Sequence, residues 1–217
     1  MSPSIRSWLP ALALACSLPA SADIIGGVEF PGGVASFADV AVSYSVGSGG
    51  VTAPHRGAVN ALGVPDYAGA GCTSVATCTF VSLGSGGSLV VRFTDNVLTG
   101  SGSSAFDLWV FEIGPDVEDT FVAVSEDGTV WHEVGKVSGG TRGIDLDFYG
   151  FGTSSEFAYV RLIDDPAEGS ASGATAGADI DAVGAISTRV LAVDAPSTAA
   201  LLPLALLGLV LTSRRRR

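Results

Sequence analysis

The chain has 217 residues and a formal net charge of −11 at pH 7, with 47% hydrophobic and 15% charged residues. All 22 acidic residues lie between Asp23 and Asp194, whereas only 6 of the 11 basic residues do. This part of the chain therefore carries a charge of −16. Such a surface repels nucleic acid and anionic lipid, which excludes a nucleic-acid-binding protein, and it favours cations and solubility.

The N-terminal residues have the pattern of an export signal. A single arginine precedes a mostly apolar stretch from Trp8 to Leu18, and Ala20-Ser21-Ala22 is a small-x-small cleavage site. We therefore expect residues 1–22 to be a signal peptide and Asp23 to be the mature N-terminus. Cys16 leaves lipoprotein processing as a second, lower-ranked alternative.

Residues 23–192 suit one domain and read as short strands separated by turns. In Ser88–Thr94, the apolar residues Leu89, Val91 and Phe93 alternate along the strand and share one face. The segment 106–112 is apolar on both faces, as a central strand of a sandwich is. Further strands are expected at 37–46, 121–125, 129–134, 157–164 and 179–186.

Turn signals connect these strands. Asp127-Gly128 lies between two β-rich runs and predicts a hairpin, because glycine accepts the positive φ of a tight turn. The chain has 29 glycines, many of them in Gly/Ser loops, and no long segment between the termini has helical periodicity. We expect an all-β fold: a single jelly-roll-like β-sandwich, flanked by the signal peptide and a short C-terminal hydrophobic helix.

Cysteine usage fits an exported domain. If Cys16 leaves with the signal peptide, Cys72 and Cys78 remain, six residues apart in a loop-like stretch. An oxidising compartment favours their pairing, and their spacing differs from that of a C-x-x-C redox site. We predict a local disulfide between them.

The C-terminus has three parts: a polar stretch, an apolar run from Ala199 to Leu211, and four arginines. A basic cluster stays on the cytoplasmic side of a membrane, so the arginines predict an orientation with everything before the apolar run outside the cytoplasm. An ordinary membrane anchor is the alternative, although the run is shorter than the about 20 residues of a full span. This cytoplasmic stop consists of Arg214, Arg215, Arg216 and Arg217.

This layout resembles the PEP-CTERM sorting signal of bacterial surface and secreted proteins, over residues 193–217. Asp194 and Ala195 stand where the motif has its first proline and its glutamate. The resemblance implies processing by an exosortase-like membrane protease and transient anchoring in the inner membrane. The residues that fit the motif are Val193, Pro196, Ser197 and Thr198.

The middle of the chain carries a second resemblance, over about residues 37–187. It is similar to an extracellular domain carried by PEP-CTERM and other bacterial cell-surface proteins, itself distantly similar to discoidin-like, galactose-binding-like jelly rolls. This similarity implies a fold and a location at the cell surface or outside the cell. The segments that carry it are 61–66, 81–91, 107–112, 124–131, 159–162 and 177–183.

The sequence predicts no enzymatic activity. His55 and His132 have no partner motif, and the chain contains no G-x-S-x-G elbow, H-E-x-x-H or P-loop. Its paired acids, such as Asp145 with Asp147, would serve a glycosidase only if they faced each other across a cleft, and surface acids are the commoner explanation.

Two functions from different classes remain. The first is a module that binds extracellular polysaccharide through loops at one end of the sandwich, with Tyr67, Trp131, Tyr149 and Phe151 as the aromatic candidates. Those residues are equally explained as core aromatics. The second is a structural envelope or matrix protein without a discrete ligand.

A Ca²⁺ site is a further hypothesis. Asp179 and Asp181 are two residues apart, so on a regular strand they point to the same face, and Asp66 is a third ligand choice. Asp107 and Glu112 are weaker choices because their spacing aims them at opposite faces. The alternative is that Asp179 and Asp181 solvate a strand end or accept backbone N–H groups from a loop.

Overall fold

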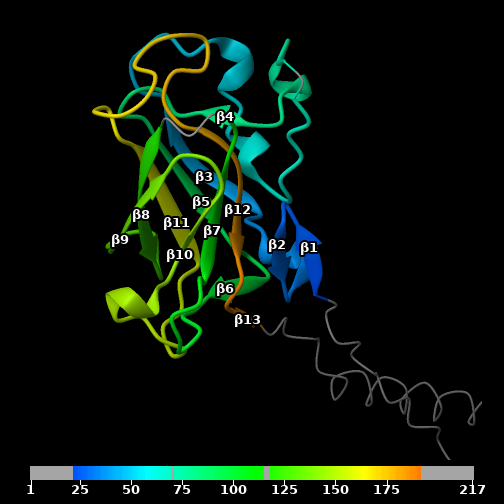
Figure 1. Cartoon of the computed structure of the whole chain (residues 1–217), viewed down its shortest axis with the longest axis vertical. Coiled ribbons are helices and arrows are strands. Elements are labelled where there is room, and N and C mark those ends of the chain that lie inside the picture. The colour runs from blue at the N-terminus through cyan, green and yellow to red at the C-terminus, as the bar shows by residue number, and fades with distance from the viewer. Residues whose placement is uncertain (1–21, 70, 115–117, 192–217) are drawn as a thin grey trace, which may run out of the picture.

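The computed structural model describes residues 22–69, 71–114 and 118–191 (Figure 1). Nearly all of the expected signal peptide and the whole sorting tail, including Val193, Pro196, Ser197, Thr198 and the four arginines, lie outside the described residues. Within them, no helix has the length and apolar character that crossing a membrane requires.

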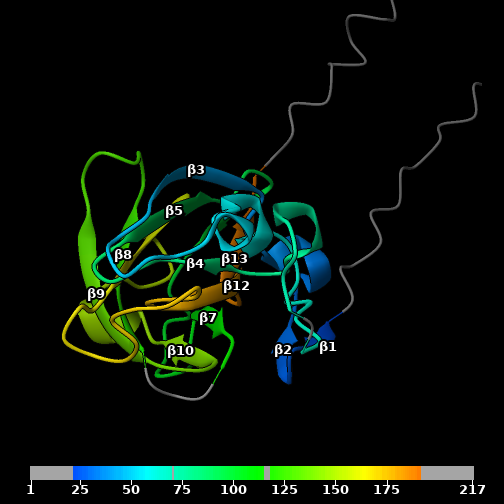
Figure 2. The ribbon, with the colours of Figure 1, turned by 90° about the horizontal axis from the view of Figure 1, so that it is seen from above.

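Two antiparallel sheets form the body of the domain, and Figure 2 shows them as two layers. The strands of the five-stranded sheet are, in spatial order, β3 (Val40–Ser45), β5 (Ser88–Arg92), β11 (Tyr159–Asp164), β8 (Asp119–Ser125) and β9 (His132–Ser138). Those of the four-stranded sheet are β10 (Arg142–Ile144), β7 (Leu108–Glu112), β12 (Asp179–Ala185) and β4 (Val81–Ser82).

Smaller elements complete the described residues. Two pairs of short antiparallel strands stand apart from the main sheets, and helix is confined to single 3₁₀ turns. The pairs are β1 (Asp23–Ile25) with β2 (Val28–Phe30), and β6 (Asn96–Leu98) with β13 (Thr188–Val190). The 3₁₀ turns are η1 (Gly33–Ser36), η2 (Ala53–His55), η3 (Ala58–Ala61), η4 (Val75–Thr77) and η5 (Asp147–Tyr149).

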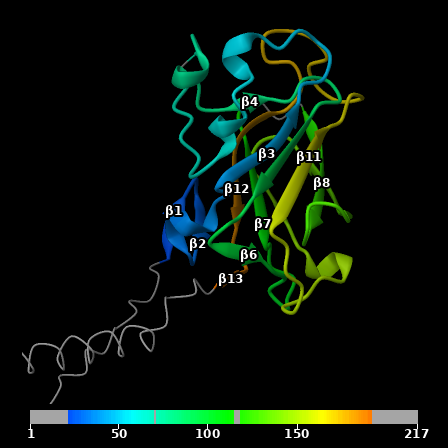
Figure 3. The same ribbon diagram turned by 180° about the vertical axis from the view of Figure 1, so that it is seen from behind.

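The main core lies between the two sheets. Figure 3 shows the strands of the two sheets from behind. Leu89 and Val91 of β5 are fully buried between the sheets together with Val110 of β7 and Ile180 of β12, as period-two alternation demands of strands that cover a core. The expectation of an all-β fold is therefore confirmed, with the packed sheets of a β-sandwich.

Strand β7 is buried on both faces, as its sequence predicts. It lies inside its sheet between β10 and β12. Its second face is covered by a smaller cluster, in which Phe111 packs against Phe30 of β2 and Phe37. The β1–β2 hairpin therefore covers the outer side of the four-stranded sheet, where an apolar side chain would otherwise face water.

The predicted hairpin at Asp127-Gly128 joins β8 to β9. Gly128 has a φ of 76°, and the Asp127 carboxylate accepts the backbone N–H groups of Thr129 and Val130 at 2.8 and 3.0 Å. These bonds extend the turn. Strand β9 consequently begins at His132, later than the expected start at Thr129, and continues to Ser138.

The two sheets approach each other along one side. Strand β9 ends the five-stranded sheet, β10 ends the four-stranded sheet, and the two lie in contact, as the view in Figure 2 shows. This meeting of two edges creates the first of the hollows considered below.

Candidate functional site: two hollows at the ends of one strand

Two hollows of the described surface lie near opposite ends of β7. One is next to η5, at the lower end of the molecule in Figure 1; we call it the aromatic pocket. The other lies where β7 ends at Glu112; we call it the acid pocket.

The aromatic pocket has a volume of about 240 Å³. Its walls come from β9, β10 and η5, and from Phe106 before β7. Three of its side chains are aromatic and well exposed: Phe148 at 79%, Phe106 at 50% and Tyr149 at 40%. Phe148 and Tyr149 are in edge contact, with ring centroids 5.1 Å apart. Such a group of exposed rings at a concave site marks an interaction surface.

Two of the aromatic side chains pack against glycines on the edge strands. A Cβ on Gly143 of β10 would stand 2.6 Å from Cγ of Phe106, and a Cβ on Gly135 of β9 would overlap the Tyr149 hydroxyl. Gly135 also has a φ of +100°, which side-chain-bearing residues rarely adopt. Both rings therefore lie against strand backbone, and a Cβ at either glycine would displace the ring beside it.

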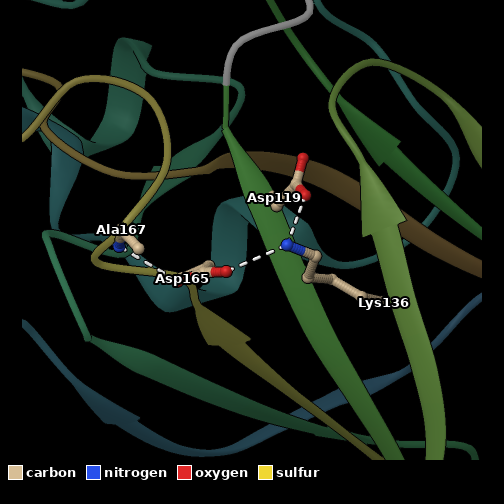
Figure 4. A network of polar contacts seen from close by, with 4 residues as sticks. All are labelled: Asp119, Lys136, Asp165 and Ala167. Atoms are coloured by element: carbon tan, nitrogen blue, oxygen red, sulfur yellow. Dashed lines mark hydrogen bonds and ion pairs between the residues drawn. The ribbon is translucent and has the colours of Figure 1, made fainter.

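Two charged residues, Asp145 and Lys136, line the aromatic pocket. Asp145, half-buried after β10, lines it together with Lys136 of β9. The Lys136 ammonium is engaged elsewhere, because it bridges Asp119 at 2.6 Å and Asp165 at 3.0 Å (Figure 4). The methylene stem of Lys136 thus contributes apolar wall, and Asp145 supplies a carboxylate.

The acid pocket is larger, at about 350 Å³, and has a different chemistry. Tyr67 is 41% exposed at this pocket, whereas its other aromatic side chain, Phe111, is buried. Burial raises the pKa of Glu112 to about 8, with the charge of Glu118 as a second cause. Burial likewise raises the pKa of Asp181 to about 6.

The three predicted calcium ligands are not gathered at one point. The pairing of β12 with β7 shifts register between Ile180 and Ala182, so the alternation that would align Asp179 with Asp181 is broken by a bulge at Asp181. The Asp181 carboxylate accepts the backbone N–H groups of Asp66 and Tyr67, at 3.2 and 3.3 Å.

Asp181 thus accepts backbone N–H groups from a loop, which the sequence analysis gave as the alternative to calcium binding. Asp179 is a neighbour of other carboxylates, Glu118 and Asp164, and burial raises its pKa to about 7. Among the described residues, Asp66, Asp179 and Asp181 do not form a group with ligand atoms within 4.8 Å of one another. Calcium binding by these three stays a prediction without a converged site.

The predicted aromatic candidates are dispersed. Tyr67 and Tyr149 lie in the two different pockets. The guanidinium of Arg161 covers Trp131, and Phe151 packs against Phe157 at the edge of the core. Phe106 and Phe148 were not among the aromatic candidates predicted from the sequence. A detectable signal was the Phe148-Tyr149 pair inside a turn-like stretch that ends on Gly150.

Cys72 and Cys78 form a disulfide, with an S–S distance of 2.00 Å. It closes the loop that contains η4, close to His55 of η2. His55 itself is buried, where it contacts Thr52 and Phe80. The other histidine, His132, packs against Phe151 at the start of edge strand β9.

The sequence matches no protein-family model, and no curated protein matches it. Among solved structures, it is similar to the C-terminal domain of a chitobiase from Bacteroides fragilis, at 16% identity and a TM-score of 0.33. The match covers 49% of this chain and 65% of that domain, so this chain spans less than two thirds of the domain's length. A similarity of this size assigns no function to either pocket.

Proposed function

We propose that this chain is an exported, non-catalytic protein of the bacterial cell envelope or extracellular matrix, and that its domain, of jelly-roll type, binds glycan in the aromatic pocket. One observation carries the proposal. Phe106, Phe148 and Tyr149 stay exposed around one hollow, and two of these rings are seated on glycines that fix their positions.

The chemistry of the pocket suits a sugar. A pyranose ring offers a face of C–H groups that packs on an aromatic ring, and hydroxyl groups that need a few placed polar partners. The three rings provide aromatic surface for the C–H face of the sugar, and Asp145 provides an acceptor for hydroxyl hydrogens. The volume of about 240 Å³ fits a short segment of a polymer that continues into solvent.

Charge narrows the class of glycan. The chain has a formal net charge of −11, and the polar group that the pocket offers is a carboxylate. An acidic polysaccharide would be repelled, so we infer a neutral or amino-sugar polymer. An anionic polymer such as alginate is then a control that should not bind.

The test is binding of the full chain to immobilised neutral, amino-sugar and acidic polysaccharides, with two matched variants. Tyr149→Ala should weaken binding at least about tenfold, as the loss of a central aromatic anchor does. Tyr67→Ala removes the same side chain at nearly the same exposure, 41% against 40%, but in the acid pocket, so it should leave binding unchanged.

Equal losses in the two variants, or a loss in Tyr67→Ala alone, would contradict this location of the site. Absence of saturable binding across the whole set of polymers would favour the alternative, a purely structural matrix protein without a discrete ligand.

Sorting is the second part of the proposal. The motif, apolar run and arginines from Val193 to Arg217 support membrane retention of a precursor, followed by removal of residues from Ala199 onward by an exosortase-like protease. Top-down mass spectrometry of the exported protein should find a C-terminus near Pro196. Mature protein that still ends at Arg217 would instead indicate a permanent tail anchor.

A further inference from the structure

A second feature adjoins the aromatic pocket and shares Asp145 with it. Asp107, Asp145 and Asp147, here called the carboxylate triad, each bring one carboxylate oxygen within 4.8 Å of the others. The sequence analysis named Asp107 as a weaker calcium ligand and Asp145 with Asp147 as paired acids, but it did not bring the three together.

Strand pairing brings the triad together. Strands β7 and β10 are antiparallel, with Leu108 opposite Ile144, so the residue before β7 meets the residues after β10. The Asp107 N–H donates to the Ile144 carbonyl at 2.8 Å, and the Leu146 N–H donates to Oδ2 of Asp107 at 2.9 Å. Asp145 and Asp147 flank Leu146, and both are therefore held next to Asp107.

Asp107 is a buried carboxylate whose two oxygens differ in their hydrogen-bond partners. Its side chain is fully buried, and its Oδ1 accepts no hydrogen bond from the described residues. A buried carboxylate oxygen without a hydrogen-bond partner is costly, and more so when further carboxylates stand beside it. Burial raises the pKa of Asp107. Hydrogen bonds with Ser187, Leu146 and Ser101 act in the opposite direction, and the nearby charge of Asp147 is a smaller raising cause. A cation next to Oδ1 of Asp107 would satisfy this oxygen.

The other two carboxylates retain free acceptor capacity. Asp145 accepts the Phe148 N–H at 3.2 Å through Oδ1, and Asp147 accepts the Gly102 N–H at 2.9 Å through Oδ2. Ion pairs between described residues serve other acids: Lys136 pairs with Asp119 and Asp165, Arg161 with Glu133, and Arg189 with Glu156. None of these three basic side chains pairs with a carboxylate of the triad.

We propose that the carboxylate triad binds one hard divalent cation, with Ca²⁺ as the ion that fits its geometry. All three ligands are oxygens, the donor class that Ca²⁺ and Mg²⁺ select. Ligands about 2.3–2.6 Å from one Ca²⁺ stand at most about 5 Å apart, so three oxygens that lie within 4.8 Å of one another can share one ion. The Ser101 hydroxyl, 3.4 Å from Oδ2 of Asp147, is a further oxygen at the rim.

The proposed cation has a structural consequence. Asp147 is the first residue of η5, and the next two residues, Phe148 and Tyr149, are walls of the aromatic pocket. A cation that holds Asp147 against Asp107 would fix η5 on the end of β7. The cation site stands whether or not the pocket binds glycan.

The experiment measures Ca²⁺ alone, without sugar. The full chain is stripped with EDTA, dialysed, and titrated with Ca²⁺ by calorimetry, and its thermal unfolding is followed with and without the ion. We expect one Ca²⁺ per chain. At a Ca²⁺ concentration of about 100 times Kd, the Tm should rise by at least about 5 °C, because the ion binds the folded state.

Variants locate the site. Asp147→Asn and, separately, Asp145→Asn should each weaken Ca²⁺ binding at least tenfold, while Asp181→Asn, at the position expected from the sequence, and the exposed Glu168→Gln should bind as the wild type does. Circular dichroism in EDTA confirms that each variant is folded. Two separate triad variants are used so that poor folding of one leaves the other to decide.

A wild-type chain that binds no Ca²⁺ would overturn the proposal. So would binding that is lost in Asp181→Asn but retained in both triad variants, since that pattern assigns the ion to the acid pocket.

Discussion

The two ends of β7 differ in how the protein handles carboxylates. At one end, burial and neighbouring acids raise the pKa of Glu112, so protonation reduces the negative charge in the acid pocket. At Asp107, three carboxylates meet within 4.8 Å beside exposed aromatic rings, an arrangement suited to a cation. One strand of five residues thus separates an end whose carboxyl groups have raised pKa values from the end at which we propose that ligands bind.

The comparison also teaches that volume alone does not identify a site. The acid pocket is the larger of the two, but its second aromatic side chain, Phe111, is committed to the cluster under the β1–β2 hairpin. The aromatic pocket is smaller, and its rings are left exposed and held by glycine. Exposed apolar surface with fixed geometry is the better sign of a partner.

The largest expected effect is the pH dependence of stability, which the acid pocket should dominate. Folding raises the pKa of Glu112 to about 8, of Asp179 to about 7 and of Asp181 to about 6. The unfolded chain releases these protons near pH 4, whereas the folded chain keeps them to higher pH. Between pH 5 and 8 the folded state therefore binds more protons, and the free energy of unfolding falls as pH rises.

Urea unfolding in EDTA at pH 5, 6.5 and 8 measures this loss, which should be on the order of a few kcal/mol. Glu112→Gln should flatten the profile, since an amide does not titrate, and the exposed Glu168→Gln should leave the slope unchanged. Stability that increases from pH 5 to pH 8 would show that these acids are ionised without penalty.

The second effect concerns the disulfide near the acid pocket. Replacing Cys72 and Cys78 together by serine opens a loop with a sequence separation of 6. The unfolded chain gains freedom, and the free energy of unfolding should fall by about 2 kcal/mol for so short a loop. Chemical denaturation measures the change. Polysaccharide and Ca²⁺ binding should be retained, because both proposed sites lie at the other end; a loss of either would mean that the two ends are coupled.

The smallest effect tests the glycine seat of the aromatic pocket. Gly143→Ala places a Cβ 2.6 Å from the base of the Phe106 ring, which must move. Because that ring is half exposed, we expect a stability loss of only about 1 kcal/mol, with weaker polysaccharide binding.

Gly71→Ala is the matched control for this glycine test. A Cβ there meets nothing within 4 Å and the backbone has no positive φ, so neither stability nor binding should change. Unaltered binding in Gly143→Ala would remove Phe106 from the proposed site.

Local patterns in the sequence determined much of the sandwich. The alternation of Leu89, Val91 and Phe93 predicted a strand with one buried face, and Asp127-Gly128 predicted the β8–β9 hairpin. The close spacing of Cys72 and Cys78 predicted their disulfide. Each of these features depends on residues a few positions apart, and for such neighbours backbone geometry alone fixes the outcome.

Only the tertiary structure decided which distant residues meet. Asp107 and Asp145 share a site because β7 pairs with β10, a contact that no local pattern encodes. The bulge at Asp181 arises from the pairing of β12 with β7, and it cancels the alternation on which the predicted calcium ligands relied. Phe148 and Phe151 are three residues apart in one turn, yet one is exposed and the other packs on the core, because exposure depends on the neighbours that the fold supplies.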